Sequence, residues 1–373
     1  MKKVKILLVG EFSGVHYNLK KGLEQLGCNA TVMANGDFFK SLHYDKKLTP
    51  YIAKNHRIRI VYIIDKFIER LLAFIYLIAF FHFNMKKYDV IQFINYQIHP
   101  MFFHKILIKY ILKRHNNTIL LACGCDSHYY DAIKEFRYSP CKQCTLIDKK
   151  GSKCSHSKSY MKSNQSIFDK YVKYIIPMCY DYDYSYKMKS KHTNKLKDLI
   201  PFPIEIKDIY INNNSDRKLN IYHPLNRTGF KGTKIIERVF IELNKKYGHI
   251  ANFIIKGNMS YDEYLEFNKT VDILVDQSLS YSYGMAATIG LSQGKVVLSG
   301  LTNEVIEKFE FYKECPIINI EPNFEDIYKK IEYLIVNCEK ITNIKTQGIY
   351  FANKYHNNVK IAKSFLNHYS ILQ

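Results

Sequence analysis

Residues 271–300 constrain the fold more than any other part of this 373-residue chain. Residues 273–275 form a short apolar run, which is typical of a buried parallel strand. After a loop rich in Ser and Tyr, a segment of small residues begins at Gly284 and ends at Gly294, and a second apolar run follows at 296–298. Because glycines often border helices, the stretch predicts a strand, a loop, a helix and a second strand.

Gly284 directly precedes the predicted helix. A glycine there lets a ligand approach the backbone closely. The N–H groups of Met285 and Ala286, with the positive end of the helix dipole, favour an anion such as a diphosphate. The alternative is an ordinary strand–helix–strand unit in which Gly284 only makes a turn, and this stretch alone favours that alternative.

A second stretch, residues 219–234, predicts a strand that runs into a basic loop and then into a helix. The loop carries Asn226, Arg227 and Lys231. The arginine and the lysine can bind one anionic group together, since arginine offers a fork of donors and lysine a point charge. In so basic a chain, an ordinary solvated loop is the alternative.

In this order, the two stretches resemble the donor half of retaining GT-B glycosyltransferases of family 4. In that family an Asn-Arg…Lys-Gly-Thr loop holds the diphosphate of a sugar nucleotide, and an Asp-Gln…Tyr-Gly…Gly-Lys stretch contributes a helix N-terminus. The matching residues here are Asn226, Arg227, Lys231, Gly232 and Thr233, then Asp276, Gln277, Tyr283, Gly284, Gly294 and Lys295. The resemblance implies a UDP- or GDP-sugar donor, a glycan or lipid-linked acceptor, retaining transfer without a required metal ion, and a role in surface polysaccharide synthesis.

One pair of residues departs from the family pattern. The family usually has two glutamates in the second stretch, the later of which binds the nucleotide ribose, whereas this chain has Tyr281 and Ile289 there. A site built to read hydroxyl groups loses much of its affinity when a polar partner is removed. Either other groups, such as Thr288 or the loop 278–283, hold the ribose, or the chain is a catalytically inactive binding or partner subunit.

The first residues predict a buried strand followed by a helix and a second strand, and the apolar run before Glu11 is too short for a signal peptide. Gly14 and His16 lie just past the end of the first predicted strand, where open α/β sheets bind ligands. In the resembled family this loop faces the donor sugar and the acceptor. Gly14 is therefore a donor-binding candidate and His16 a catalytic candidate, with a helix-capping turn as the alternative.

Gly124 and Asp126 follow the predicted strand 118–122 and match a Gly-x-Asp motif that lies close to the transferred sugar in the resembled family. His128 comes two residues later. A carboxylate and an imidazole at the end of a strand can position a sugar hydroxyl or stabilise a developing positive charge. Asp126 and His128 are therefore catalytic candidates, although a helix cap explains an aspartate here equally well.

Residues 201–218 contain a Pro pair, an Asn run and several charges, which predicts a linker between two domains. The expected architecture is α/β, with two Rossmann-like domains facing across a cleft. Residues 1–205 would form the acceptor-side domain, and residues 206–373 the domain that binds the donor. By the resemblance, a helix within 349–372 crosses back to the first domain.

Nine cysteines without a secretory signal indicate a reducing compartment rather than a set of disulfides, so we predict a cytoplasmic protein. An insertion near residues 138–160 contains four groups that could bind a tetrahedral zinc ion: Cys141, Cys144, Cys154 and His156. Because it contains only one C-x2-C pair, we favour a loop with incidental cysteines and keep zinc as the alternative.

The formal net charge of +21 implies an anionic partner. No polybasic block or aromatic RNA-binding motif stands out, so nucleic acid is not expected. Residues 58–83 are the most apolar helical stretch, but the uncharged run 71–83 is too short to span a bilayer. A core helix is favoured, and a helix that lies on an anionic membrane, as a peripheral contact, is the alternative.

Overall fold

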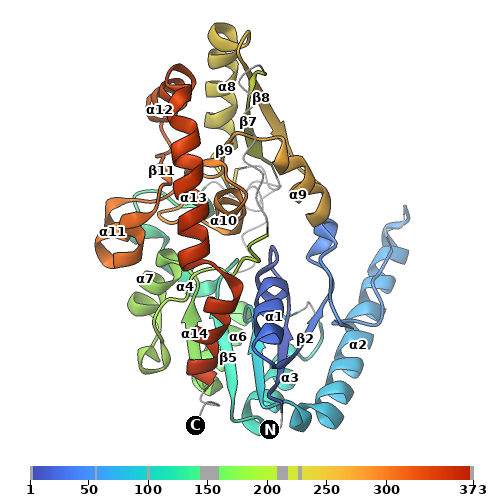
Figure 1. Ribbon diagram of the computed structural model, residues 1–373. Coiled ribbons are helices and arrows are strands. Elements are labelled where there is room, and N and C mark those ends of the chain that lie inside the picture. Colours follow the sequence, from blue (N-terminus) through green and yellow to red (C-terminus); the bar gives the residue numbers. More distant parts are fainter. Residues whose placement is uncertain are drawn as a thin grey trace.

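The computed structural model describes residues 3–54, 57–98, 101–142, 159–207, 217–225 and 229–369 (Figure 1). The first domain contains a sheet of six parallel strands in the order β3-β2-β1-β4-β5-β6. Its strands are β1 (Lys5–Val9), β2 (Asn29–Ala34), β3 (Lys46–Lys47), β4 (Val90–Phe93), β5 (Thr118–Ala122) and β6 (Tyr174–Pro177). The order reverses between β1 and β4, which is the point where ligands bind in sheets of this type.

The apolar run of β1 is buried on both faces of the sheet. Ile6 and Leu8 belong to the core cluster that contains α1 and α14, whereas Leu7 and Val9 belong to the cluster of α2, α3 and α6. This alternation follows from the two-residue period of a strand. The helices of this domain are α1 (Val15–Gln25), α2 (Arg59–Asn84), α3 (His104–Arg114), α4 (Ser127–Asp131), α6 (Ser159–Tyr171), α7 (Tyr180–Lys189) and α14 (Asn358–Tyr369).

The second domain contains five parallel strands in the order β11-β10-β9-β7-β8. Its strands are β7 (Leu219–Pro224), β8 (Ala251–Lys256), β9 (Ile273–Val275), β10 (Val296–Ser299) and β11 (Ile318–Asn319), and its helices are α8 (Thr233–Tyr247), α9 (Tyr261–Lys269), α10 (Met285–Ser292), α11 (Asn303–Lys308), α12 (Phe324–Val336) and α13 (Ile341–Tyr355). Short 3-10 turns complete both domains: η1 (Phe38–Lys40), η2 (Met85–Lys87), η3 (Ile133–Glu135), η4 (Pro140–Lys142), η6 (Thr193–Lys195), η7 (Glu310–Glu314) and η8 (Cys338–Lys340).

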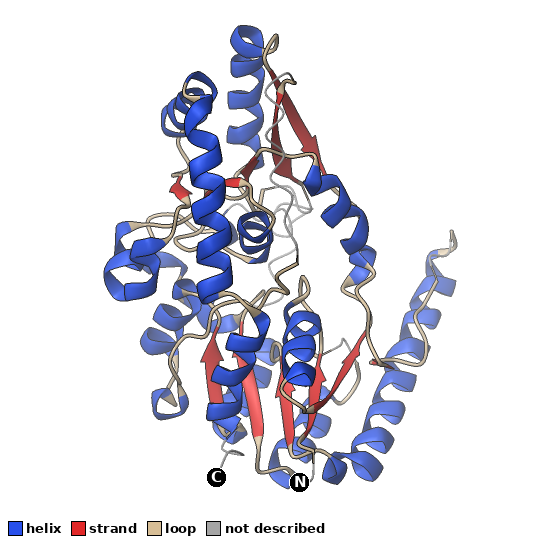
Figure 2. Cartoon of the chain, viewed as in Figure 1, coloured by secondary structure: helices blue, strands red, loops and turns tan. Residues whose placement is uncertain are grey.

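The strands of the two sheets point toward each other, so the loops at their carboxyl ends meet between the domains (Figure 2). The predicted architecture of two Rossmann-like domains is therefore confirmed. The predicted strand at 273–275 has those bounds, and α10 begins directly after Gly284, as predicted. The exact domain boundary at 205/206 stays a prediction, although the strands of each sheet lie on their own side of it.

The C-terminal helix returns to the first domain, as predicted, and lies beside α1 (Figure 1). The crossing is fixed where Ile204 forms an isolated parallel bridge with Asn357. Next to it, the His356 ring bonds the Phe202 carbonyl through Nδ1 at 2.8 Å, and its Nε2 lies 2.8 Å from the Tyr283 hydroxyl. These contacts join the linker, the last helix and a loop of the second domain.

α2 packs on the first domain along one stripe of buried residues. This stripe contains Asp65, Glu69, Ala73, Leu77 and Phe81. The core-helix interpretation therefore holds for part of the helix only, because many of its other apolar side chains are exposed. In the described part of the chain, no helix is long and apolar enough to cross a membrane.

Close contact between α1 and α14 depends on Gly22. A Cβ atom at this position would lie 2.2 Å from the Asn358 carbonyl oxygen, a backbone atom that cannot rotate away. We expect Gly22→Ala to lower the free energy of unfolding by about 1 to 3 kcal/mol, the usual cost of overpacking. Urea unfolding of both proteins measures the difference.

Gly348 provides the matched control, because it is also a helical glycine. Among the described residues, a Cβ there would meet Leu291, with the side-chain Cδ2 at 3.2 Å and the backbone at an ordinary 3.7 Å. Gly348→Ala is expected to leave stability unchanged or to raise it by up to about 1 kcal/mol through helix propensity. Equal losses in the two variants would contradict the close packing of α1 on α14.

Candidate functional site

The two stretches that carried the sequence argument come together at the carboxyl edge of the second sheet. Lys231 Nζ lies 2.6 Å from Asp276 Oδ1. The Ser278 N–H donates to the Lys231 carbonyl at 3.1 Å. Gly232 has a φ of 80°, and a Cβ there would lie 2.2 Å from Ser278 Oγ. Only glycine fits this close approach of the two loops.

The His223 ring is buried at the same edge of the second sheet. Its Nδ1 lies 2.7 Å from the Val275 carbonyl and its Nε2 lies 2.9 Å from Thr233 Oγ1, so both ring nitrogens have partners. Burial lowers the pKa of His223 to about 4. The ring is therefore neutral at pH 7 and joins β7, β9 and the start of α8.

The N-terminus of α10 is open at Gly284. No described residue lies within 4 Å of the position that a Cβ would occupy there, and none of the described side chains caps this helix. Met285 is buried behind it. Thr288 is also buried, and its hydroxyl donates to the Gly284 carbonyl at 3.2 Å. The first-turn N–H groups at the start of α10 thus remain available for an anion.

Two of the predicted donor-binding residues, Asn226 and Arg227, lie outside the described residues. Of the polar side chains predicted for this loop, the structure places Lys231. The prediction for Arg227 therefore remains a prediction.

Tyr281 and Ile289, which replace the family glutamates, are both packed between elements. Ile289 is 3% exposed and belongs to a core cluster that also contains Tyr261 and Met285. The Tyr281 hydroxyl accepts hydrogen bonds from the backbone N–H of Arg137 at 2.8 Å and from its Nε at 3.2 Å. Ile289 has no group that could bind a ribose hydroxyl, and the Tyr281 hydroxyl is buried and already bonded to Arg137.

Gly14 lies where the first domain meets the second. It begins α1 with a φ of 88°, and a Cβ there would lie 3.3 Å from the Tyr261 ring of α9. The Tyr17 ring packs edge-on against Tyr261, with ring centroids 6.1 Å apart. Gly14 therefore faces the second domain, and its role in donor binding remains a prediction.

His16 is directed into the first domain. Its Nδ1 lies 2.7 Å from the Gly10 carbonyl, and its Nε2 lies 3.2 Å from Gln92 Nε2. Burial lowers the pKa of His16 to about 4. The Gln92 side chain also accepts a hydrogen bond from the Tyr369 hydroxyl at 2.7 Å, so the ring is part of the packing of α14.

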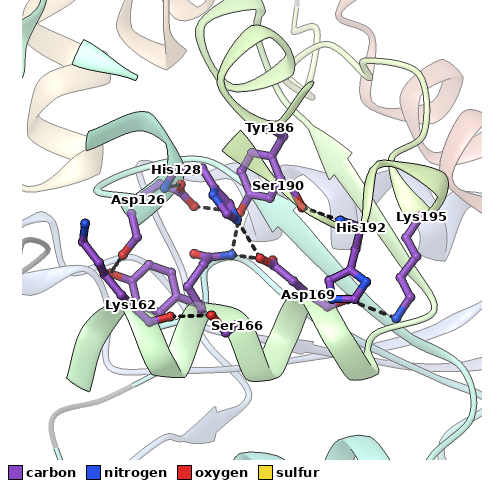
Figure 3. A network of polar contacts seen from close by, with 12 residues as sticks. Asp126, His128, Lys162, Ser166, Asp169, Tyr186, Ser190, His192 and Lys195 are labelled. Carbon is purple, nitrogen blue, oxygen red and sulfur yellow. Dashed lines mark hydrogen bonds and ion pairs between the residues drawn. The ribbon is translucent and has the colours of Figure 1, made fainter. Parts of the chain in front are cut away.

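Asp126 and His128 belong to one polar network, which Figure 3 shows. Asp126 Oδ1 accepts the N–H of His128 at 2.7 Å and that of Tyr129 at 3.1 Å, so Asp126 is the N-cap of α4. Its Oδ2 accepts the Tyr186 hydroxyl at 2.8 Å. Burial raises the pKa of Asp126, against the opposing effects of the His128 charge and the Tyr186 hydrogen bond.

His128 is held by Asp169 of α6, with 2.6 Å between Nε2 and Oδ2. Gln165 donates to Asp169 Oδ1 and to the Tyr186 hydroxyl, each at 2.9 Å, which closes the network (Figure 3). Burial lowers the pKa of His128, but the hydrogen bond to Asp169 and the nearby carboxylates outweigh it, and the net pKa is raised. No local pattern in the sequence indicates Asp169, because it lies 41 residues from His128.

Comparison with known proteins identifies the fold of this chain. No protein-family profile and no curated protein sequence matches the chain. Among solved structures, Anabaena HepE in complex with UDP-glucose superimposes with a TM-score of 0.63 at 12% identity, covering 99% of this chain and 100% of that one. The chain has the GT-B fold.

Two further solved structures with the GT-B fold also match this chain. Sucrose-phosphate synthase from Thermosynechococcus elongatus matches with a TM-score of 0.59 at 12% identity, covering 98% of each chain. UDP-GlcNAc 2-epimerase from Neisseria meningitidis, bound to UDP-GlcNAc, matches with 0.53 at 12% identity, covering 98% of this chain and 99% of that one. Because transferases and an epimerase share the fold, the fold alone does not fix the reaction.

Asp181 of α7 joins the two GT-B domains through a loop of the second. Its carboxylate accepts the Ser280 hydroxyl at 3.0 Å, the Tyr281 N–H at 3.2 Å and the Ser282 N–H at 3.0 Å. The Ser282 hydroxyl also donates to it. The same loop leads directly to Gly284, so a first-domain carboxylate positions the start of α10.

Glu11 is a site residue that the sequence argument missed. Its carboxylate accepts the N–H groups of Gly14 at 3.0 Å and Tyr17 at 2.7 Å. Burial raises the pKa of Glu11 to about 7, although these hydrogen bonds oppose the rise. The rule that identified Gly14 would also have identified Glu11, because this glutamate follows the first strand even more closely.

The zinc alternative falls mainly outside the described residues. Of its four candidate ligands, the structure describes Cys141 alone. Among described residues, no group of three His, Cys, Asp or Glu side chains could hold a metal ion. Zinc binding by this insertion remains a prediction.

Buried histidines make stability depend on pH. His16, His223 and His356 each have a pKa lowered by burial to about 4, against an ordinary value of 6.5. Below pH 6.5 the unfolded chain binds protons that the folded chain does not, so each histidine destabilises the fold as pH falls from 6.5 to 4. Each contributes up to about 3 kcal/mol. The raised pKa values of Glu11, Asp126, Asp181 and His128 act in the opposite direction and offset part of this loss.

We therefore expect the free energy of unfolding to decrease as pH is lowered from 6.5 to 5. In a His356→Asn variant, the decrease should be smaller by the contribution of one histidine, about 1.5 kcal/mol between pH 6.5 and 5, because this group no longer titrates. Urea unfolding at several pH values measures both slopes. Identical slopes in the two proteins would show that His356 is not a neutral, buried imidazole.

Proposed function

We propose that the protein transfers a sugar from a UDP- or GDP-sugar to a glycan or lipid-linked acceptor in surface polysaccharide synthesis. The observation that carries the proposal is the open N-terminus of α10 at Gly284, next to a loop that the Asp181 carboxylate fixes. A helix N-terminus with free N–H groups suits a diphosphate. The complexes of HepE with UDP-glucose and with UDP support this donor class.

In this proposal the diphosphate binds at the N–H groups of Met285 and Ala286. Lys231 lies on the loop packed against residues 276–278, which precede Gly284 in the chain, and its ion pair with Asp276 holds the ammonium group in a fixed position. Arg227 is proposed to supply a second cation. Together these groups would stabilise the charge that develops on the leaving diphosphate.

On the first-domain side, we propose that His128 positions a sugar or acceptor hydroxyl. Its ring is partly exposed, and Asp169 fixes its orientation. Asp126 acts through its cap on α4 and its hydrogen bond to Tyr186, as a positioning residue. We do not extend the proposal to His16, because both its ring nitrogens have partners inside the domain. Retaining stereochemistry and transfer without a metal ion rest on the family resemblance.

A non-catalytic binding or partner subunit is the second candidate function. The observation that favours it is the packing of Tyr281 and Ile289, which leaves no carboxylate at the positions where the resembled family has its glutamates. Calorimetric titration with UDP, GDP and their sugar conjugates separates the two functions. Binding of one nucleotide supports the transferase, and binding of none by the folded protein supports the partner subunit.

Gly284→Val tests the donor site without disturbing the unliganded fold. The backbone at Gly284 is extended, and a Cβ there lies within 4 Å of none of the described residues, so the melting temperature should not change. The added methyl groups would occupy the space proposed for the diphosphate. We expect nucleotide affinity to fall at least tenfold, or about 1.4 kcal/mol.

Gly348→Ala serves as the control in this experiment, because it changes a helical glycine of α13 that packs against the Leu291 side chain. It should bind nucleotide as the wild type does. Unchanged affinity in Gly284→Val would show that the nucleotide binds elsewhere.

A further inference from the structure

Many apolar side chains of α2 (Arg59–Asn84) point to solvent. Among them, Ile60 is 65% exposed, and Ile63 and Phe67 are each 55% exposed. The set, which we call the α2 apolar face, consists of Ile60, Val61, Tyr62, Ile63, Ile64, Phe67, Ile68, Leu72 and Ile75. Single exposed apolar residues are common, but a contiguous group of this size on one helix indicates an interaction surface.

The opposite side of the same helix buries its acids. Asp65 accepts the Tyr51 hydroxyl and the N–H of Lys54, the latter at 2.9 Å. Glu69 accepts the N–H of Ala53 at 2.9 Å. A strap of residues 51–54 therefore covers both carboxylates. In its first half, α2 therefore differs from an ordinary surface helix, which faces its acids outward and its apolar residues inward.

Because these acids are buried, the surface around the α2 apolar face carries positive charge. Residues 46–88 contain nine Lys and Arg residues and two acids, and both acids are buried. Lys54, Arg57, Arg59 and Arg70 are exposed. Positive charge beside an apolar strip is the pattern that anionic lipid headgroups attract, at roughly 1 kcal/mol per basic residue near the surface.

The start of α3 extends the face. Phe103 and Ile106 are exposed, and the Phe74 and Phe103 rings lie 5.3 Å apart, so α3 and α2 form one continuous surface. Figure 1 shows α2 at the outer edge of the first domain, with its N-terminal half away from the rest of the chain. The face is therefore accessible to a flat partner.

We propose that the α2 apolar face docks onto an anionic membrane, with α2 lying in the plane of the interface. Ile60, Ile63 and Phe67 enter the boundary between headgroups and acyl chains, and Arg59 and Arg70 contact lipid phosphates. The face includes Leu72 and Ile75 of the uncharged run 71–83, whereas Ala73, Leu77 and Phe81 of the same run are buried. This inference goes beyond the proposed function and does not depend on sugar transfer.

The chain contains no Trp, which makes a single-tryptophan reporter straightforward. We would compare Phe67→Trp with Tyr350→Trp, a control on α13 of the second domain whose parent side chain is 63% exposed. Vesicles contain phosphatidylcholine either alone or mixed with phosphatidylglycerol. We expect anionic vesicles to shift the emission of the Phe67→Trp variant to the blue and brominated lipid to quench it, with neither effect in the control.

A second comparison removes the apolar contact. Ile63→Ser with Phe67→Ser should weaken binding to anionic vesicles at least tenfold. The matched pair, Ile241→Ser with Tyr350→Ser, changes side chains that are 53% and 63% exposed, and it should bind as the wild type does. Because all four side chains are exposed, both pairs should keep the wild-type melting temperature. Wild-type binding should weaken as salt rises, since salt screens exposed charges.

Three results would overturn the proposal. In the first, the wild type does not bind anionic vesicles. In the second, it binds neutral and anionic vesicles equally, so the basic residues have no role. In the third, the Phe67→Trp emission shifts with protein concentration in the absence of lipid, so the face pairs two copies of the chain.

Discussion

The buried carboxylate of Asp181 is the interaction on which the arrangement of the site depends. It belongs to the first domain, yet the groups that donate to it belong to the loop of the second domain that precedes Gly284. Burial raises the pKa of this carboxyl, and the hydrogen bonds oppose the rise. A buried charge is stable only when such donors are in place. The loop therefore has this conformation only while the two domains are packed together.

Two other contacts hold the domains in the same relation. His356 bonds the linker through the Phe202 carbonyl and the second domain through Tyr283, directly before α14 returns to the first domain. Tyr261 packs on Gly14 at the start of α1. Because the carboxyl ends of both sheets face this boundary, the contacts that join the domains also position the start of α10. The packing of the domains and the geometry of the site therefore depend on the same contacts.

Local patterns in the sequence were enough to predict the strands and the helix at Gly284. Apolar runs and glycines act over a few residues, so they specify an element wherever its partners lie. The partners of buried polar groups cannot be found in this way. Asp181 meets Ser280 99 residues away, and the strap 51–54 covers Asp65 of α2. Such pairings depend on how the chain packs, which hydrophobic periodicity does not encode. Because α2 buries one stripe of residues that includes Asp65, the isoleucines on its other sides face outward.

Part of the positive charge of this chain is concentrated away from the proposed diphosphate site. The net charge and the site can therefore bind different anions. The net charge of +21 predicts an anionic partner, and Lys231 lies on the loop that packs against residues 276–278, upstream of the proposed diphosphate site. However, Asp276 already pairs with Lys231, so the proposed site would draw its attraction for a diphosphate mainly from the helix N–H groups. Nine basic residues and two acids give residues 46–88 a net charge of +7, which is one third of the total, and both acids are buried. This part of the excess charge therefore lies on the surface around α2. The anion that binds this surface need not be the anion that binds at the start of α10.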